Sequence, residues 1–427
     1  MIILKDIIKS SEKNKNEVRR LVAKIINRVK SKGDDAIINM TEHFDGVKID
    51  KLEIPEDEIK KAYDLIDEKT VKTLHFAAEQ IELFAKRQLA CLKPLEFEGI
   101  SGIILGHKLI PIRSCGCYIP GGRYPLPSTA LMTVLIAKVA GVKRVVACSP
   151  PSKQFLSIHP TILVALDIAG ADEIYCIGGA QAIAACAYGT ETIKPVDLIV
   201  GPGNKYVNEA KRQVIGDVGI DSLAGPSEIL IIADESASSD YIVIDLLAQC
   251  EHDPATRSAL VTTSRKLANR VLEKIEKEAS TLATSKVILK SWEENGQIIF
   301  VDNLEEAIEF ANNYAPEHLE VQTTCNNEIV NKLVNFGSLF IGYNSPVAFG
   351  DYVSGPNHTL PTMRAARYSN GLWVGNFIKV SCYQKINKKG AIALSAAGSH
   401  MAKIEGLLAH QRSINIRTGK YRYIKRP

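Results

Sequence analysis

The amino-acid sequence predicts an α/β protein that contains at least two parallel sheets. Three stretches in the middle of the chain each read as a buried strand, a Gly- or Ser-rich turn and a helix. They are DEIYCIGGAQAIAACAYG (172–189), VDLIVGPGNKYVNEAKRQVIG (196–216) and EILIIADESASSDYIVIDLLAQCEHD (228–253). Strands that alternate with helices are typical of βαβ units, in which helices cover both faces of a parallel sheet.

Further elements follow from the spacing of apolar residues. Apolar side chains recur at helical spacing over residues 16–33, and Gly33 is suited to end that helix. The other predicted elements are mostly helical segments at 50–90, a helix at 128–140, a strand at 143–151 and a helix at 399–412. The pattern weakens after about residue 365.

Composition and charge exclude several classes of protein. Of 427 residues, 46% are hydrophobic and 23% are charged, an ordinary balance for a soluble globular chain of two or more domains. The net charge of +4 is small, so we expect no nucleic-acid partner. No long apolar run is present, so we expect no membrane span and no membrane partner. Nine cysteines without a CxxC pair, after a start too charged for a signal peptide, predict a reduced, cytoplasmic protein.

Four Gly-rich loops could bind an anionic ligand. They are CYIPGGRYPLPST (117–129), IGGAQAIA (177–184), GPGNKYV (201–207) and AGPSEIL (224–230). Backbone N–H groups at the start of a helix attract anions such as a pyrophosphate. None of the loops fits the GxGxxG fingerprint, and any one of them alone is more readily explained as a structural turn. Together they favour a nucleotide-type ligand.

Polar side chains suited to a metal gather in the C-terminal half. Gln249 and His252 lie three apart near the end of a predicted helix, so they share a face. Asp351 and His358 fall in one loop, and EGLLAHQRS supplies Glu405 and His410. Each histidine alone is more readily a structural one. Together they predict one polar site assembled from distant segments, for which zinc with three or four N and O donors is a candidate.

A carboxylate and an imidazole stand side by side in NYAPEHLEVQ (313–322). Adjacent side chains of an extended chain point to opposite faces. Glu317 and His318 can serve one site only if a turn at Pro316 brings them together.

The motifs resemble the histidinol dehydrogenase family. Eight strings occur in that family's order and spacing over roughly residues 20–415. They are YIPGG (118–122), GGAQAIAA (178–185), GPGNKYV (201–207), AGPSE (224–228), LLAQCEHDP (246–254), APEHLE (315–320), GDYVSGPNHTLPT (350–362) and EGLLAHQ (405–411).

The resemblance implies two incomplete Rossmann-like parallel-sheet domains with small helical N- and C-terminal arm segments. The first domain would comprise 21–122 plus 226–364, and the second 123–225. Residues 1–20 would form a helical segment that packs with the C-terminal arm, 365–427. This arm would form a homodimer whose active site is shared between chains.

The resemblance also implies a four-electron oxidation of L-histidinol to L-histidine through an enzyme-held aldehyde, the final steps of histidine biosynthesis. The reaction would use NAD and one Zn²⁺ per subunit. His318 would be the general base, and Glu317 would activate water. By the same resemblance, the zinc ligands would be Gln249, His252, Asp351 and the partner subunit's His410. NAD would be bound by Tyr118, Gln181 and Asn204. The substrate would be bound by Ser227, Gln249, His252, His318, Asp351, His358, Glu405 and His410.

Four alternatives remain open at this point. A related zinc and NAD dehydrogenase could oxidise another amino-alcohol or a diol such as a sulfopropanediol. A zinc hydrolase could use Glu317 without NAD, and a metal-binding module could lack catalysis. A thiohemiacetal mechanism at Cys250 is the fourth. The basic tail at Lys420–Arg426 is more readily a solvated end than an arm for nucleic acid.

Overall fold

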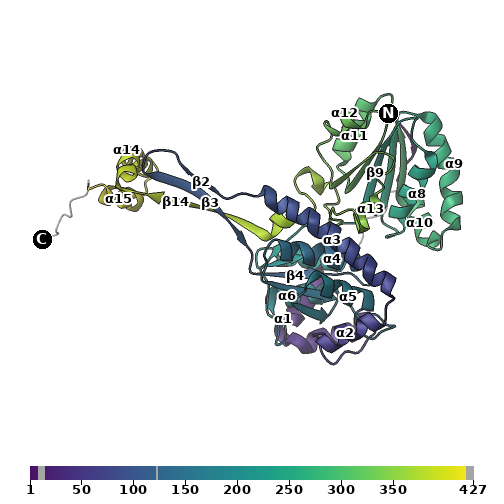
Figure 1. The fold of residues 1–427 in the computed structure, drawn as a ribbon, viewed down its shortest axis with the longest axis horizontal. Coiled ribbons are helices and arrows are strands. Elements are labelled where there is room, and N and C mark those ends of the chain that lie inside the picture. The colour runs from purple at the N-terminus through teal and green to yellow at the C-terminus, as the bar shows by residue number, and fades with distance from the viewer. Residues whose placement is uncertain (8–14, 122–123, 420–427) are drawn as a thin grey trace. The chain divides into compact units, whose positions relative to one another are not determined.

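The computed structural model describes residues 1–7, 15–121 and 124–419 (Figure 1). The chain divides into two compact units. The main unit consists of Met1–Gln88 and Ile112–Phe377, and the ribbon unit of Leu89–Pro111 and Ile378–Pro427. The basic tail, Gly122 and Arg123 lie outside the described residues.

The main unit contains a six-stranded sheet in the order β1-β11-β10-β9-β12-β13. Its strands are β1 (Ile2–Lys5), β9 (Glu228–Ala233), β10 (Arg257–Thr262), β11 (Gly296–Phe300), β12 (His318–Gln322) and β13 (Ser338–Ile341). All neighbours pair in parallel except β1, which runs antiparallel to β11. The helices that follow these strands are α8 (Ser239–Cys250), α9 (Arg265–Thr281), α10 (Ser285–Asn295), α11 (Leu304–Tyr314), α12 (Asn326–Val330) and α13 (Val347–Tyr352).

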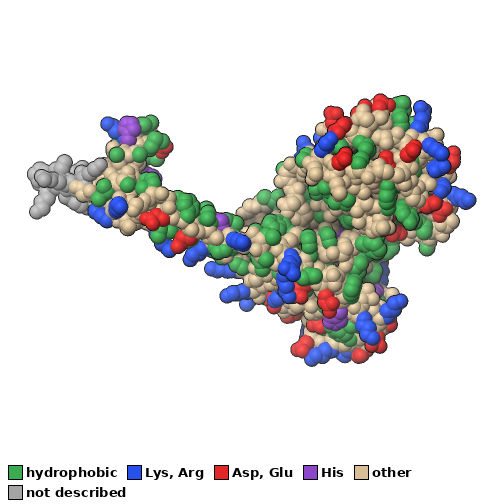
Figure 2. Space-filling model, turned by 45° about the horizontal axis from the view of Figure 1, so that its top comes forward, with side chains coloured by type: hydrophobic (Ala, Val, Ile, Leu, Met, Phe, Trp, Pro, Cys, Tyr) green, Lys and Arg blue, Asp and Glu red, His purple; other side chains and the backbone are tan. Residues whose placement is uncertain are grey.

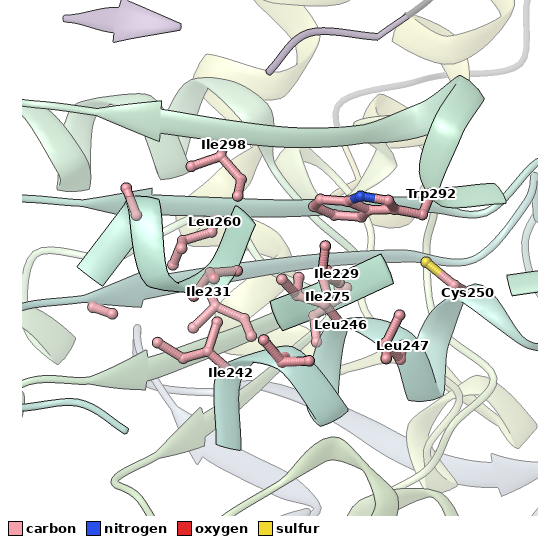
Figure 3. Packing of buried hydrophobic residues seen from close by; sticks show 14 of the residues in the cluster. Ile229, Ile231, Ile242, Leu246, Leu247, Cys250, Leu260, Ile275, Trp292 and Ile298 are labelled. Carbon is pink, nitrogen blue, oxygen red and sulfur yellow. The ribbon is translucent and has the colours of Figure 1, made fainter. Parts of the chain in front are cut away.

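Alternating residues of β9 build a separate core on each face of this sheet. Ile229 and Ile231 join a cluster with apolar residues of α8, α9 and α10, including Trp292 (Figure 3). Leu230 and Ile232 pack on the other face with residues of α11 and α12. A strand covered on both faces is apolar along its length, which explains the uninterrupted ILIIA run at 229–233.

A second, five-stranded parallel sheet has the order β6-β5-β4-β7-β8. Its strands are β4 (Ser114–Tyr118), β5 (Arg144–Ser149), β6 (Glu173–Cys176), β7 (Leu198–Val200) and β8 (Gly219–Ile220). The helices around it are α1 (Lys15–Asp45), α2 (Glu56–Asp64), α4 (Pro127–Val139), α5 (Pro160–Ala169), α6 (Gly179–Tyr188) and α7 (Lys205–Val214). Helix α1 packs on α6 and α7, and α2 packs on α5. Helix α3 (Glu68–Cys91) leads out of the main unit.

The ribbon unit is a three-stranded antiparallel sheet with two helices. The strands, in the order β14-β3-β2, are β14 (Ile378–Ile386), β3 (Ile103–Pro111) and β2 (Leu95–Glu98). Helices α14 (Lys388–Ile404) and α15 (Leu408–Arg417) pack against each other. Apolar side chains lie on the face of this unit in view in Figure 2. The exposed large apolar residues of the whole unit are Leu95, Phe97, Ile100, Leu105, Ile110, Val380, Ile386, Ile392, Leu394, Met401, Ile404, Leu407, Leu408 and Ile416.

The predicted α/β class with two parallel sheets is confirmed, whereas several predicted boundaries are wrong. Residues 1–20 begin with strand β1 rather than a helix. Segment 21–122 does not join 226–364, because α1, α2 and β4 build on the five-stranded sheet and β2 and β3 belong to the ribbon unit. The arm starts near residue 378 rather than 365. A buried strand's apolar pattern does not name its partner strand, so chain order misled the assignment. The packing of 1–20 with the arm stays a prediction.

Two other expectations concern membranes and thiols. No helix among the described residues is long and apolar enough to cross a membrane. All nine cysteines are free thiols, and six of them are buried.

Candidate active site

Glu317 and His318 lie where α11 passes into β12. Helix α11 ends at Tyr314. The next residue, Ala315, adopts the left-handed conformation (φ 50°, ψ 62°), and Pro316 prevents the helix from continuing. Both side chains are buried, with 6% of Glu317 and 4% of His318 exposed. Burial of two ionisable groups costs free energy unless they are hydrogen-bonded, so their partners define the site.

Strand β9 brings the two side chains together through its first residue. The main-chain N–H of Glu228 donates to Oε2 of Glu317 at 2.8 Å, and the carbonyl oxygen of Glu228 lies 3.0 Å from Nδ1 of His318. The same Nδ1 is 3.5 Å from Oε2 of Glu317. The turn at Pro316 therefore directs both groups to one place rather than to opposite faces.

The two side chains change each other's acidity. Burial alone lowers the pKa of His318, but the charges of Glu317 and Asp351 outweigh it and raise the pKa to about 9. Burial raises the pKa of Glu317 to about 8, although the neighbouring imidazole opposes that shift. Groups perturbed in this way by burial and a charged partner are candidates for acid–base chemistry.

Asp351 faces the other ring nitrogen of His318. It lies on α13, and its Oδ1 is 3.7 Å from Nε2 of His318. Burial alone raises the pKa of Asp351, but the charges of His318, His358 and His252 lower it overall. His358 is fixed through Nδ1 to the carbonyl oxygen of Asp351 (3.1 Å) and through Nε2 to Oγ1 of Thr129 (2.9 Å). Asp351 is thus the centre of the predicted cluster.

Gln249 and His252 stand at the end of α8, next to this centre. Burial lowers the pKa of the His252 imidazole, and the charge of Asp351 opposes that shift, which places His252 in the same electrostatic environment. The Gln249 side chain is only 2% exposed. Its Oε1 has no hydrogen-bond partner, and neither has Nε2 of His318. Buried polar atoms without partners are uncommon, and they indicate a ligand site here.

The donors fit a zinc ion without forming a complete set. An amide oxygen, an imidazole nitrogen and a carboxylate oxygen are all donor types that Zn²⁺ can take, and the unpartnered Gln249 Oε1 is available to it. Over the described parts of the chain, no three His, Cys, Asp or Glu side chains form a ready cluster. Glu405 and His410 are carried by the ribbon unit and are exposed there, at the end of α14 and within α15.

Tyr118 lies where a dinucleotide is expected in the five-stranded sheet. It ends β4, which pairs with β5 on one side and β7 on the other, so the order of strands reverses there. Ligands of open parallel sheets bind at the carboxyl ends of strands at such a reversal. Its hydroxyl oxygen accepts the N–H of Gly179 at 3.1 Å. A Cβ at Gly201 would collide with its carbonyl oxygen, so both Gly-rich turns converge on Tyr118.

The other two predicted cofactor residues have different surroundings. Gln181 is buried on α6. A Cβ at Gly179 would lie only 2.7 Å from Oε1 of Gln181, so the side chain of Gln181 is packed against the Gly-Gly turn. Asn204 is exposed and caps α7, since its Oδ1 accepts from the N–H groups of Tyr206 (2.9 Å) and Val207 (3.2 Å). Its contact with NAD stays a prediction.

Three further residues lie in or beside the site: one was predicted to bind substrate, and two were not predicted. Ser227, a predicted substrate residue, is half-buried immediately before β9, and its carbonyl oxygen accepts the N–H of Arg257. Glu228 and Thr129 were not predicted, although both lie inside quoted Gly-rich loops. The only signal in the sequence was their position: Glu228 begins strand β9, and Thr129 lies in the first turn of helix α4.

Cys250 does not support a thiohemiacetal mechanism. Its thiol is fully buried in the apolar cluster of Figure 3, 3.2 Å from Oγ of Ser258. Burial raises the pKa of the thiol, so the nucleophilic thiolate is disfavoured. The structure therefore opposes this alternative.

Known proteins resemble the chain along nearly its whole length. The family model for histidinol dehydrogenase matches residues 8–418. A histidinol dehydrogenase from Methanocaldococcus jannaschii is 45% identical over 411 residues, covering 96% of this chain and 95% of the relative. A histidinol dehydrogenase homolog from Shouchella clausii is 44% identical over 405 residues, covering 95% of both chains.

A solved structure has the same fold. The crystal structure of histidinol dehydrogenase from Elizabethkingia anophelis matches with a TM-score of 0.91 and 35% identity, covering 97% of this chain and 94% of that one. The resemblance inferred from the motifs is confirmed, and with it the prediction of a dehydrogenase enzyme. The chain belongs to the histidinol dehydrogenase family.

Proposed function

We propose that this protein oxidises L-histidinol to L-histidine in two NAD-dependent steps, in the cytoplasm, at the end of histidine biosynthesis. The observation that carries the proposal is the buried Glu317–His318 pair, held by Glu228 and facing Asp351. Two successive jobs, proton removal and water activation, need two bases within one pocket, and this pair supplies them.

One zinc ion per subunit would be held by Gln249, His252 and Asp351, with the partner subunit's His410 as the fourth ligand. When bound, zinc would fix the imidazole and amino nitrogens of the substrate. Support comes from the unpartnered Oε1 of Gln249 and from the low pKa of Asp351, which keeps that carboxylate charged. His358, Ser227 and the arm residue Glu405 would line the rest of the substrate pocket.

His318 would remove the proton of the substrate hydroxyl through Nε2. The Glu228 carbonyl can only accept, so the neutral ring keeps its proton on Nδ1 and its lone pair on Nε2. Nε2 is also the ring atom without a hydrogen-bond partner. A cation held by Asp351 would offset part of the attraction that raises the pKa of His318, of which Glu317 is the larger source, and so would shift the ring toward acting as a base near neutral pH.

Glu317 would activate the water that the aldehyde must add before its second oxidation. Its Oε2 accepts from Glu228, which orients the carboxylate. Burial raises its pKa to about 8, close to the pH at which a general base works best. His318 would then assist the second oxidation as it did the first.

NAD would bind at the carboxyl end of β4 and accept one hydride in each oxidation. Tyr118, Gln181 and Asn204 would hold it beside the two Gly-rich turns. The support is the convergence of both turns on Tyr118 at the reversal of strand order. The absence of GxGxxG is compatible with this site because backbone of the Gly-Gly and Gly-Pro-Gly turns is what approaches the ligand.

The ribbon unit would form a homodimer and deliver Glu405 and His410 to the partner's active site. Its many exposed apolar side chains, in a unit with few buried residues of its own, are suited to cover by a second copy.

The test is the stoichiometry of NADH. Purified protein loaded with Zn²⁺ should form two NADH per L-histidinol consumed, and removal of zinc with a chelator should abolish turnover while the circular dichroism spectrum stays unchanged. One NADH per substrate, or turnover independent of zinc, would contradict the proposal.

A second candidate is a dehydrogenase of another amino-alcohol, or of a diol such as a sulfopropanediol. It is kept because the chain is as similar to the Shouchella clausii homolog as to the named histidinol dehydrogenase. Turnover of such an alcohol in the absence of histidinol turnover would favour this candidate. The zinc hydrolase alternative would require that NAD fails to bind, which calorimetry can measure.

A further inference from the structure

A second buried carboxyl group lies on the face of β12 that carries His318. Glu320 is two residues further along the strand, so its side chain points to the same face. It is 1% exposed, although neither the predicted zinc set nor the catalytic pair includes it. A carboxyl group buried to this extent needs partners, and these partners reveal its role.

Glu320 joins β12 to helix α13. Its Oε1 accepts the main-chain N–H of Val347, the first residue of α13, at 2.9 Å. Its Oε2 accepts from Nε2 of Gln322 at 3.1 Å, and the same Nε2 is 3.2 Å from Oδ2 of Asp245 on α8. The carboxyl group is therefore held on both sides.

Helix α13 also fits tightly against the next strand. A Cβ at Gly350 would lie 2.5 Å from the ring of Phe340 on β13. That ring is 6.1 Å from the imidazole of His318. Glycine at this position allows the close approach, and the residue that follows it is Asp351.

We propose that Glu320 is a positioning residue for the reaction. By accepting the N–H of Val347, it fixes α13 to β12 and so places Asp351 against Nε2 of His318. The inference rests on the proposed function, because it assigns Asp351 to the metal and His318 to the substrate. His318 and Glu320 belong to one five-residue strand, and Val347 and Asp351 to one six-residue helix, so this single hydrogen bond couples the two partners.

The charge of Glu320 suggests how to test it. Burial and the neighbouring Asp245 raise its pKa to about 8, so the group is largely neutral at pH 7. A glutamine has the same shape as a neutral carboxyl group, and its oxygen can accept the Val347 N–H. Glu320→Gln should therefore keep the function, whereas Glu320→Ala should lose it.

The experiment measures two quantities for each variant: the Zn²⁺ affinity of metal-free protein, by competition with a chromogenic chelator, and kcat with L-histidinol. Glu320→Ala should weaken both by about 10- to 100-fold, the usual effect of losing a residue that orients a metal ligand. Glu320→Gln should stay within about threefold of the unsubstituted protein, since the acceptor remains.

Val347→Pro tests the same hydrogen bond from the other side. Proline is tolerated at the first position of a helix and removes the N–H, but it also replaces a buried valine side chain. Val347→Ala, which shortens the same side chain and keeps the N–H, is therefore measured beside it and should retain zinc affinity. Val347→Pro should show the same losses as Glu320→Ala. The matched control is Ser264→Ala, which removes the hydrogen bond that Oγ of Ser264 accepts from the N–H of Leu267 at the start of α9. Ser264→Ala should lower the free energy of unfolding about as much as Glu320→Ala does, because each loses one hydrogen bond at a helix start, and it should leave zinc affinity and kcat unchanged.

Unchanged zinc affinity in Glu320→Ala and Val347→Pro would overturn the inference. So would a loss in Glu320→Gln as large as in Glu320→Ala, because it would assign the effect to charge. If the unsubstituted protein does not oxidise histidinol, the proposed function fails separately, and zinc affinity alone still tests the role of Glu320.

Discussion

The main-chain N–H of Glu228 lies 2.8 Å from Oε2 of Glu317, and the carbonyl oxygen of Glu228 lies 3.0 Å from Nδ1 of His318. One residue at the start of β9 therefore orients both proposed bases. Backbone groups cannot change charge and move little, so the relative position of the two side chains is fixed before any substrate binds. This arrangement leaves Nε2 of His318 as the basic atom.

Replacing His318 by asparagine should slow both oxidations. The amide can occupy the space but cannot accept a proton, and loss of a general base costs about 100- to 10,000-fold in rate. Stopped-flow NADH absorbance should show the loss with histidinol and with the aldehyde as separate substrates. The control is His159→Asn, because His159 caps α5 through its ring nitrogen, away from the site, and asparagine is a good cap. Normal oxidation of either substrate by His318→Asn would exclude the base role.

Replacing Lys211 by methionine should destabilise the protein and weaken NAD binding. The ammonium group is buried, 2.5 Å from Oδ1 of Asp221 and 2.6 Å from the carbonyl oxygen of Gly201, whose N–H donates to the same aspartate. Removal of one partner from a buried ion pair costs about 3–5 kcal/mol, because the other charge remains unpaired. It would also release the Gly-Pro-Gly turn beside Tyr118.

Urea denaturation and NAD titration measure these two effects. Lys138→Met is the control, since Lys138 pairs with Asp172 at the surface and such a pair contributes about 0–1 kcal/mol. If both lysine variants lost the same small amount of stability and of NAD affinity, the role assigned to Lys211 would be contradicted. The double variant Lys211→Met/Asp221→Leu should recover part of the stability.

Glu320 should contribute to the pH dependence of stability. Its folded-state pKa is raised to about 8, whereas a free glutamate titrates near about 4.3. Between these values the folded protein holds a proton that the unfolded chain releases, so the free energy of unfolding falls as the pH rises. Glu320→Gln cannot titrate and should lose less stability from pH 5 to pH 8. Urea unfolding at both pH values tests this, and parallel losses in the two proteins would contradict it.

Subunit mixing should reveal whether the active site is shared. His410→Ala and Gln249→Ala should each be inactive, because each removes a proposed zinc ligand. If the partner's His410 completes the site, a mixed dimer contains one intact site of two, so random mixing should restore about a quarter of the activity. Coexpression of the two variants followed by a histidinol assay measures it. A mixture as inactive as its components would indicate that each site uses its own chain.

The sequence predicted the layered fold because the signal is local. Strand–turn–helix units are visible in apolar runs such as ILIIA (229–233), whose residues are all buried on β9. Partner choice between strands is not local. Strand β4 pairs with β5 and β7, while the segment that leads to it was assigned to the other sheet. Strand β1 is only four residues long and pairs with β11 nearly 300 residues away, which no periodicity could predict.

The site was predictable in its residue types but not in its contacts. The motifs indicated Glu317, His318, Asp351 and His358, and the structure brings these four together. Glu228 was missed because it acts through its backbone, which has no side-chain signature. Glu320 was missed because an acidic residue in a strand usually faces solvent, and only the fold shows that it is buried.

The most direct test of two bases with separate tasks is the NADH yield of Glu317→Gln in a single turnover. Glutamine keeps the oxygen that accepts from Glu228, so His318 should still be oriented and the first oxidation should proceed. Without a base to activate water, the second oxidation should slow by about 100-fold or more. The account predicts a rapid burst of one NADH per histidinol with a trappable aldehyde, where the unsubstituted protein gives two. Equal slowing of both oxidations, with no aldehyde trapped, would contradict it.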